Sequence, residues 1–320
     1  MRRTSVGPFL NMFSTDGRAL EPGPGGGAPM TVERSRAEPG GDARGRRGPY
    51  DAPGSGAVGA IPGPLRSVVI ETGGMAALLV TVFGSAIRNP VGYWRAAMLD
   101  FYTTVRRAAL PMAAAIFGFL LFFSLVVVIF FNQVGAVSLG SALLFLYGFR
   151  AFTVFVVAVV VSGVAGAALT ADLGARKIRD ELDAMRVMGL DPVRELVVPR
   201  VVSMVVLTTL IVLPGLGVSA VALQIGASYY GHLAAVDYYD NLFAALVPLE
   251  LGSVVLNCFL LGIMIAIVCC YKGLNASGGS IGVGRAVNQA VVICYVGLFV
   301  FQLAYNAVFL GLFPEVGKLR

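Results

Sequence analysis

The sequence predicts an all-α integral membrane protein, with one helix in the membrane interface followed by five transmembrane helices. Two observations support this fold class. The 320 residues are 57% hydrophobic and 13% charged, with a mean hydropathy of +0.80, whereas soluble domains average about 25% charged residues. Five apolar stretches are also long enough to cross a bilayer, which takes about 20 helical residues. A charged segment separates the second stretch from the third.

Residues 1–64 differ in composition from the rest of the chain. They contain 14 of the 40 glycines and nine of the 16 prolines, and they show almost no apolar periodicity. Such a segment cannot bury enough apolar surface to offset its conformational entropy. No apolar core of the kind found in secretory signals follows Arg2 and Arg3. We therefore expect a disordered cytoplasmic tail.

The next segment, residues 65–107, is expected to form an interfacial helix and an elbow. Its apolar part, residues 65–87, is interrupted by Arg66 and Glu71, and its cleanest run, residues 75–87, is shorter than a bilayer requires. We interpret it as a helix in the interface, with a membrane span as the alternative. Aromatic residues alternate with arginines over residues 88–107, which is typical of the belt at a membrane surface.

The remainder, residues 108–320, forms the membrane domain. Its predicted spans are residues 108–131, 142–170, 196–223, 251–271 and 286–313, and only a helix satisfies the backbone of a single run in lipid. With the N-terminus inside, the inner segments carry 12 Lys and Arg residues and the outer segments carry three. The positive-inside rule therefore predicts a multi-pass protein of the cytoplasmic membrane, with a cytoplasmic N-terminus and a periplasmic C-terminus.

The charged segment, residues 172–200, would then be cytoplasmic. Ile178, Leu182 and Met185 fall at i, i+4 and i+7, which predicts one amphipathic helix over residues 172–189. Opposite charges at i, i+4 would support this helix (Arg176–Asp180, Lys177–Glu181 and Arg179–Asp183).

The ends of this helix are also marked in the sequence. Gly189 is expected to end it in a left-handed conformation, and Asp191 with Pro192 is expected to cap the helix that follows. A solvated loop that only fixes topology is one interpretation of the segment. A helix that binds a groove on a partner is the other, and the apolar face between two firm ends favours it.

No catalytic or metal-binding pattern is visible. His232 is the single histidine, and the four cysteines (Cys258, Cys269, Cys270 and Cys294) lie in apolar windows without zinc-site spacing. The sequence lacks a G-x-x-x-x-G-K-[ST] motif, and we interpret the glycine-rich residues 278–284 as a flexible turn before the last span. We expect no cofactor, and no nucleic-acid binding, because the arginines cluster in the tail and at span ends, where they suit lipid headgroups.

Ionisable residues near the bilayer are candidates for a transport cavity, because they are costly there. Arg150 lies near the outer end of the second span, and Glu250 lies at the outer start of the fourth. They would pair across a cavity, or each would reach the headgroups separately. Asn257 would line the same cavity or form helix–helix hydrogen bonds with Gln302 and Asn306.

The segment ADLGARKIRDELDAMRVMGLDPVRELVVPR resembles the signature of the MlaE/YrbE permease family, approximately E-x-x-D-A-[LM]-x-x-M-G-x-[DN]-P followed by P-R. The matching positions are Glu181, Asp183, Ala184, Met185, Met188, Gly189, Asp191, Pro192, Pro199 and Arg200. Residues 270–292 are similar to the second signature of that family, and the resemblance extends over residues 65–313. ADLGAR and CYKG are most similar to A-type YrbE subunits of actinobacterial Mce systems, while NASGG is closer to B-type subunits.

The resemblance implies half of the permease of an ABC transporter that moves lipids. Its partners would be a second YrbE-type permease subunit in a heterodimer, a cytoplasmic ABC ATPase dimer and a periplasmic assembly of Mce proteins. The cargo would be imported fatty acids, sterols or related lipids, and this chain would have no catalytic site of its own. The cytoplasmic helix would be the coupling helix that contacts the ATPase, through Ile178, Glu181, Leu182, Asp183, Met185, Arg186, Met188, Gly189, Asp191 and Pro192.

Two alternatives remain from the residues alone. An ion-coupled secondary transporter would carry acidic residues at span centres and inverted repeats, and five spans divide poorly into repeats. A membrane-bound lipid-modifying enzyme would show a nucleophile or a metal cluster at the interface, and the sequence shows neither.

Overall fold

The computed structural model describes residues 63–88, 93–135, 140, 144–231, 235–245 and 248–312. The chain divides into two units, Met1–Arg46 and Arg47–Arg320, and every described residue belongs to the second. Within these ranges the regular structure is helical, without a strand, which confirms the predicted all-α class. The expected disordered tail lies outside the described residues, apart from Gly63 and Pro64 at the start of the first helix.

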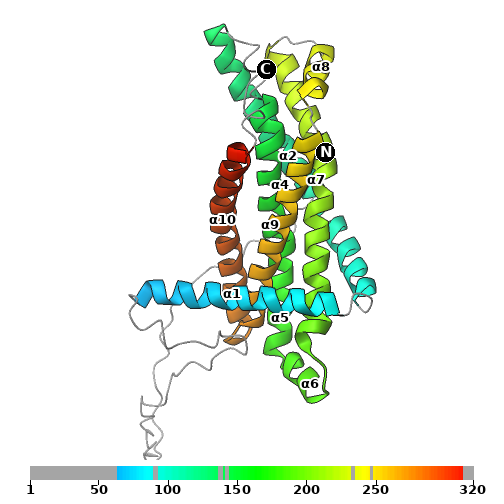
Figure 1. Cartoon of the computed structure of the whole chain (residues 1–320), viewed down its shortest axis with the longest axis vertical. Coiled ribbons are helices and arrows are strands. Elements are labelled where there is room, and N and C mark those ends of the chain that lie inside the picture. Colours follow the sequence, from blue (N-terminus) through cyan, green and yellow to red (C-terminus); the bar gives the residue numbers. More distant parts are fainter. Residues whose placement is uncertain are drawn as a thin grey trace, which may run out of the picture. The chain divides into compact units, whose positions relative to one another are not determined.

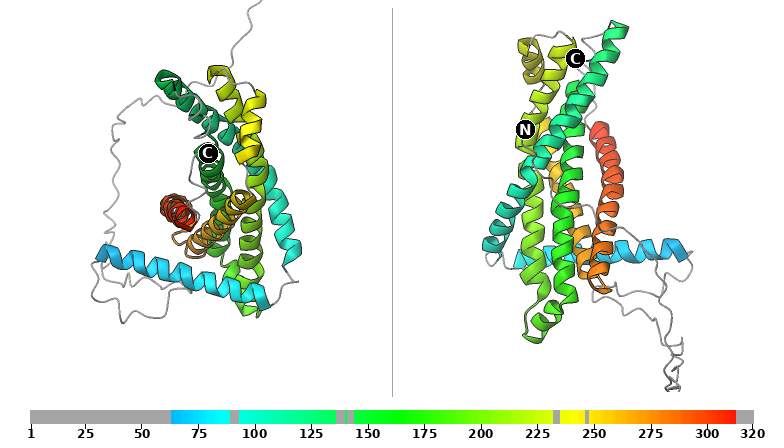
Figure 2. Two further views of the ribbon diagram at one scale, coloured as in Figure 1. Left: turned by 45° about the horizontal axis from the view of Figure 1, so that its top comes forward. Right: turned by 180° about the vertical axis from the view of Figure 1, so that it is seen from behind.

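Five long helical segments form a bundle, and each predicted span lies mainly within one of them (Figures 1 and 2). They are α2 (Trp94–Val134); η1 (Leu144–Phe152), α4 (Thr153–Val161), η2 (Ser162–Gly166) and α5 (Ala167–Ile178) in succession; η3 (Val193–Val197) with α7 (Val198–Gly231); α9 (Pro248–Leu274); and α10 (Gly279–Leu312). The short helices α6 (Glu181–Val187) and α8 (Ala235–Ala245) lie at opposite ends of the bundle (Figure 1). The sequence did not predict α8.

A single stripe of α2 packs against α7. Its buried residues recur every four positions (Ala108, Met112, Ile116, Leu120, Ser124 and Val128). Ser124 Oγ donates a hydrogen bond to the carbonyl oxygen of Leu223, 3.0 Å away. A Cβ atom at Gly226 would lie 2.4 Å from that hydroxyl oxygen. The two helices can approach this closely because α7 has no side chain there, as is common between membrane helices.

The helix α1 (Gly63–Arg88) runs across the bundle instead of along it (Figure 1). Its length and composition would allow a span. However, Leu78 and Val82 are buried while Val80 is 71% exposed, so one face packs on the bundle and the other is free. The buried ammonium of Lys272 on α9 lies 2.9 Å from a carboxylate oxygen of Glu71. The helix is therefore held to the bundle along one face, and its place in the membrane interface stays a prediction.

The second span is not a uniform α-helix. The π-helical segments η1 and η2 interrupt it, and η3 begins the third span in the same way. A π-helical turn places one extra residue in the helical circuit, and such turns are often found at functional sites. An apolar run in the sequence does not reveal such turns, because hydropathy does not depend on which backbone carbonyl accepts the hydrogen bond of each amide. Arg150 lies within η1.

Candidate functional site

The charged segment folds as a corner between two membrane helices, which we call the charged corner (residues 172–200). The prediction of one continuous helix here is wrong, because α5 ends at Ile178 and α6 begins at Glu181. Between them Asp180 adopts a left-handed conformation with φ of 57°, which aspartate tolerates better than most residues. Ile178 therefore does not share a helical face with Leu182 and Met185.

The end of the charged corner follows the sequence prediction closely. Gly189 has φ of 78°, and the amide of Leu190 donates to the carbonyl oxygen of Met185 at 2.9 Å. This pattern closes a helix through a left-handed glycine. Asp191 Oδ1 accepts a hydrogen bond from the amide of Val193 at 3.0 Å, so Asp191 caps the segment in which Pro192 is the first residue.

Burial changes which side chains a partner could touch. Leu182 is only 3% exposed and belongs to the core of this chain. The prediction that Leu182 lies on an apolar face open to a partner is therefore wrong. The exposed apolar side chains lie at the end of α6 and just after it, over residues 187–190, which we call the tip. Val187 is 89%, Met188 67% and Leu190 46% exposed. The helical period identified the apolar residues of α6 but could not show which of them the protein covers itself. Val187 and Leu190 were missed for that reason.

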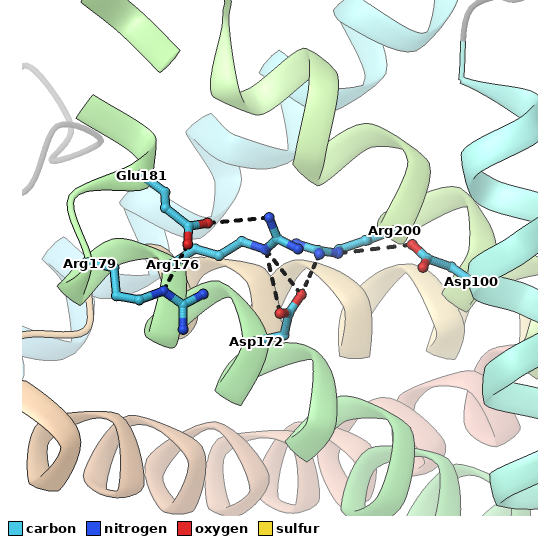
Figure 3. Close-up of polar contacts among 6 residues, drawn as sticks. All are labelled: Asp100, Asp172, Arg176, Arg179, Glu181 and Arg200. Atoms are coloured by element: carbon cyan, nitrogen blue, oxygen red, sulfur yellow. Dashed lines mark hydrogen bonds and ion pairs between the residues drawn. The ribbon is translucent and has the colours of Figure 1, made fainter. Parts of the chain in front are cut away.

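Ion pairs cross the break between α5 and α6 (Figure 3). Glu181 accepts hydrogen bonds from Arg179 at 2.8 Å and from Arg176 at 3.4 Å. Lys177 lies 3.2 Å from Asp183, which also pairs with Arg186 at 3.1 Å. These contacts replace the predicted i, i+4 pairs, because the turn at the break brings α6 back toward the end of α5.

Arg200 extends these contacts to the membrane helices (Figure 3). It lies on α7, and its guanidinium pairs closely with Asp172 of α5 and lies 3.9 Å from Asp100 of α2. Asp172 also lies 3.4 Å from Arg176. The resulting chain, which we call the corner network, runs through Asp100, Arg200, Asp172, Arg176, Glu181 and Arg179. Sequence reasoning missed it, although Arg200 closes the signature and Asp172 begins the charged segment.

Arg150 and Glu250 form the predicted ion pair, and the cavity that they would line stays a prediction. Arg150 Nη1 lies 3.9 Å from Glu250 Oε1, and both side chains are 9% exposed. The guanidinium carbon of Arg150 is also 4.8 Å from the ring centroid of Phe309, a favourable cation–π distance. The pair joins η1 to α9 and brings α10 alongside.

Asn257 lies on α9, as Glu250 does. We call the group of Arg150, Glu250, Asn257 and Gln302 the buried wall. Its Nδ2 donates to Gln302 Oε1 on α10 at 3.3 Å, which confirms the helix–helix hydrogen bond. Asn306 bonds within its own helix to the carbonyl oxygen of Gln302. Across the part of the chain that the structure describes, three buried atoms of this wall lack hydrogen-bond partners: Arg150 Nη1, Asn257 Oδ1 and Gln302 Nε2.

The other sequence candidates have no visible part in either arrangement. His232 lies outside the described residues. The four cysteines are buried free thiols. The predicted flexible turn over residues 278–284 is wrong in extent, since α10 already begins at Gly279, and only Gly278 and Gly279 adopt positive φ angles there.

The sequence model of the family described as Permease MlaE matches residues 97–308. A chloroplastic protein of Arabidopsis thaliana named TRIGALACTOSYLDIACYLGLYCEROL 1 is 28% identical over 176 residues, covering 54% of this chain and 49% of that protein. Probable ABC transporter permease proteins are also similar. One from Synechocystis sp. is 30% identical over 53% of this chain and 65% of its own length, and one from Rickettsia prowazekii is 29% identical over 42% and 51%. This chain thus spans about half the length of the curated relatives it matches.

Proposed function

Because this chain belongs to the MlaE permease family, whose match covers both the charged corner and the Arg150–Glu250 pair, we propose that it is half of the permease of a lipid-moving ABC transporter. ATP would be hydrolysed by a separate ATPase subunit. The observation that carries this proposal is the exposed apolar tip on a capped, ion-paired corner between two membrane helices. A solvated loop that only fixes topology does not need exposed apolar side chains such as Val187 and Met188.

The tip would bind a groove on the ATPase. Val187, Met188 and Leu190 would supply the apolar contact, since such residues on a short helix are the usual anchors of groove binding. The acidic and basic residues of α6, Glu181, Asp183 and Arg186, would hold its orientation through the ion pairs described above. If the ATPase contacts the tip differently in its two nucleotide states, it shifts the balance between two arrangements of the adjoining spans.

The lipid path would pass the wall of Arg150, Glu250 and Asn257. A buried guanidinium nitrogen and a buried amide oxygen without hydrogen-bond partners are costly in a bilayer. A polar headgroup that passes them would satisfy both for part of the transport cycle. The long apolar faces on either side suit acyl chains.

The remaining assignments rest on the resemblance of the signature segments. A second YrbE-type permease subunit would complete the membrane channel as a heterodimer, and a periplasmic assembly of Mce proteins would deliver fatty acids, sterols or related lipids for import. The subtype would be an A-type subunit of an actinobacterial system. The N-terminus would face the cytoplasm and the C-terminus the periplasm.

Affinity purification of the tagged full chain in mild detergent tests the proposal. Co-purification of an ABC ATPase, identified by mass spectrometry and by ATP hydrolysis, is expected for the wild type and lost in a Val187→Asp, Met188→Asp double variant. The matched control is Val236→Asp on α8, a 69% exposed position at the other end of the bundle, which should retain the ATPase. A wild type that purifies without an ATPase and transports lipid without ATP would overturn the proposal in favour of secondary transport.

A further inference from the structure

A cavity of about 170 Å³ lies between α2, the second span and α7, next to the corner network. The charged side chains that line it are Asp100, Arg107, Asp172 and Arg200. The apolar ones include Ala165, Leu169 and Met204. A cavity lined by both charged and apolar side chains is complementary to an amphiphile rather than to a simple ion.

Residues near the cavity are of the types found at the depth of the lipid headgroups. On α2, Trp94 and Tyr102 are 49% and 59% exposed, and the guanidinium carbon of Arg106 lies 5.8 Å from the ring centroid of Tyr102. Exposed aromatic residues mixed with arginines mark the membrane–water boundary. Arg107 is five residues after Tyr102, which is about 8 Å along a helix. The cavity therefore faces the leaflet on the side of the charged corner.

Arg200 lines the cavity and, within the described part of the chain, one nitrogen of its guanidinium group is buried without a hydrogen-bond partner. Its side chain is 12% exposed, and it reaches Asp172 through Nη2 and Asp100 through Nε. Among the residues that the structure describes, Nη1 of Arg200 has no hydrogen-bond partner. A buried guanidinium N–H without an acceptor is unfavourable. Arg107, exposed at the rim, adds a second guanidinium, and paired arginines are the usual ligands of phosphate oxygens.

Asp100 supplies the opposite charge at the same rim. Its side chain is 46% exposed and lies 3.9 Å from Arg200 at the nearest atoms, so it contributes a carboxylate close to the two guanidinium groups. We propose that the cavity binds the headgroup of a phospholipid that carries both a phosphate and an amine, as in the phosphatidylethanolamine class. The phosphate contacts Arg107 and Arg200, the amine contacts Asp100, and the first part of an acyl chain lies along Ala165, Leu169 and Met204.

This site is separate from the wall of Arg150, Glu250 and Asn257, and it does not depend on which lipid is transported. Because Arg200 also holds Asp172, the bound phosphate becomes one more member of the corner network. Lipid composition in that leaflet then acts on the same residues that hold α6 in place.

Photolabelling of the full chain, with the subunits that co-purify, tests the site. The protein is placed in nanodiscs of phosphatidylethanolamine and phosphatidylglycerol, with a trace of phosphatidylethanolamine that carries a diazirine near the start of an acyl chain. Labelled peptides are mapped by mass spectrometry. Labelling near residues 100–107 and 165–169 is expected to fall about tenfold in Arg107→Gln, which removes a charged hydrogen bond. A similar fall is expected in Ala168→Phe, which fills the cavity and keeps every charge.

The controls are Arg106→Gln, the neighbouring arginine outside the cavity lining, and Ala114→Phe, another exposed alanine of the bundle. Both should label like the wild type and retain the ATPase, so that a failure here is distinguishable from a failure of the proposed function. Equal labelling of Arg107→Gln and Arg106→Gln would overturn the site. Competition by inorganic phosphate would show that it binds a free anion instead. Equal competition by phosphatidylglycerol and phosphatidylethanolamine would refute the role given to Asp100.

Discussion

Removal of one member of the Arg150–Glu250 pair is the sharpest test of the buried wall. The two charges are 3.9 Å apart and their side chains are 9% exposed, which corresponds to an attraction of about 4 kcal/mol at an effective dielectric constant of about 20. Arg150→Gln or Glu250→Gln alone leaves the other charge buried without its partner, which typically costs about 3–5 kcal/mol. The double variant removes both charges, so most of this loss should be recovered.

The assay is a double-mutant cycle on thermal unfolding in mild detergent, read from the loss of the monodisperse peak in size-exclusion chromatography. Each single variant should lower the midpoint by roughly 10 °C, and the double variant should lie within about 3 °C of the wild type. The charge-swapped variant, Arg150→Glu with Glu250→Arg, should recover lipid transport that each single reversal loses. Losses that simply add in the double variant would refute the pairing and favour two side chains that reach the headgroups independently.

Three further predictions concern packing and backbone geometry. Gly262→Ala places a Cβ 2.2 Å from a threonine hydroxyl of α7 and should destabilise the protein by about 1–2 kcal/mol, whereas Gly252→Ala on the same helix meets open space and should leave the thermal midpoint equal or higher. Glu71→Gln removes the carboxylate that holds α1 to the buried Lys272. A Leu78→Cys reporter in α1 should then react faster with a thiol reagent than the same reporter in the chain that keeps Glu71. An unchanged reaction rate would mean that the ion pair does not hold the helix. Asp180→Gly relieves a left-handed conformation and should stabilise by up to about 1 kcal/mol, while the same change at Asp183 inside α6 should destabilise, and equal effects at the two positions would contradict the observed break.

Sequence reasoning predicted the features that depend on one segment at a time. The spans follow from apolar length, the turn at Gly189 from its freedom at positive φ, and the cap at Asp191 from a side chain that reaches an amide two residues away. The Arg150–Glu250 pair was found because a charge in a span has few acceptable neighbours, and the topology placed the two at one depth.

The features that sequence reasoning missed depend on the surroundings of a segment. Leu182 and Val187 have similar character and both belong to α6, but only the packing of the whole chain shows that the first is covered and the second is not. The break at Asp180 lies between good helix-forming residues on both sides, and the ion pairs form across the turn instead of along one helix. Asp100 and Arg200 are 100 residues apart, so no local pattern joins them.

The two sets of charges in this protein differ in how readily they can rearrange. Members of the corner network near α6 are substantially exposed, with Arg179 at 59% and Glu181 at 39%, and an exposed ion pair contributes about 1 kcal/mol or less. A partner that binds the tip can therefore exchange these contacts at little cost. Arg150 and Glu250 are both buried, and neither can leave the other unless a new polar group arrives. Contacts at the corner can therefore change more easily than the buried pair. If the proposed function holds, this difference would let ATPase binding act only when a lipid headgroup is present.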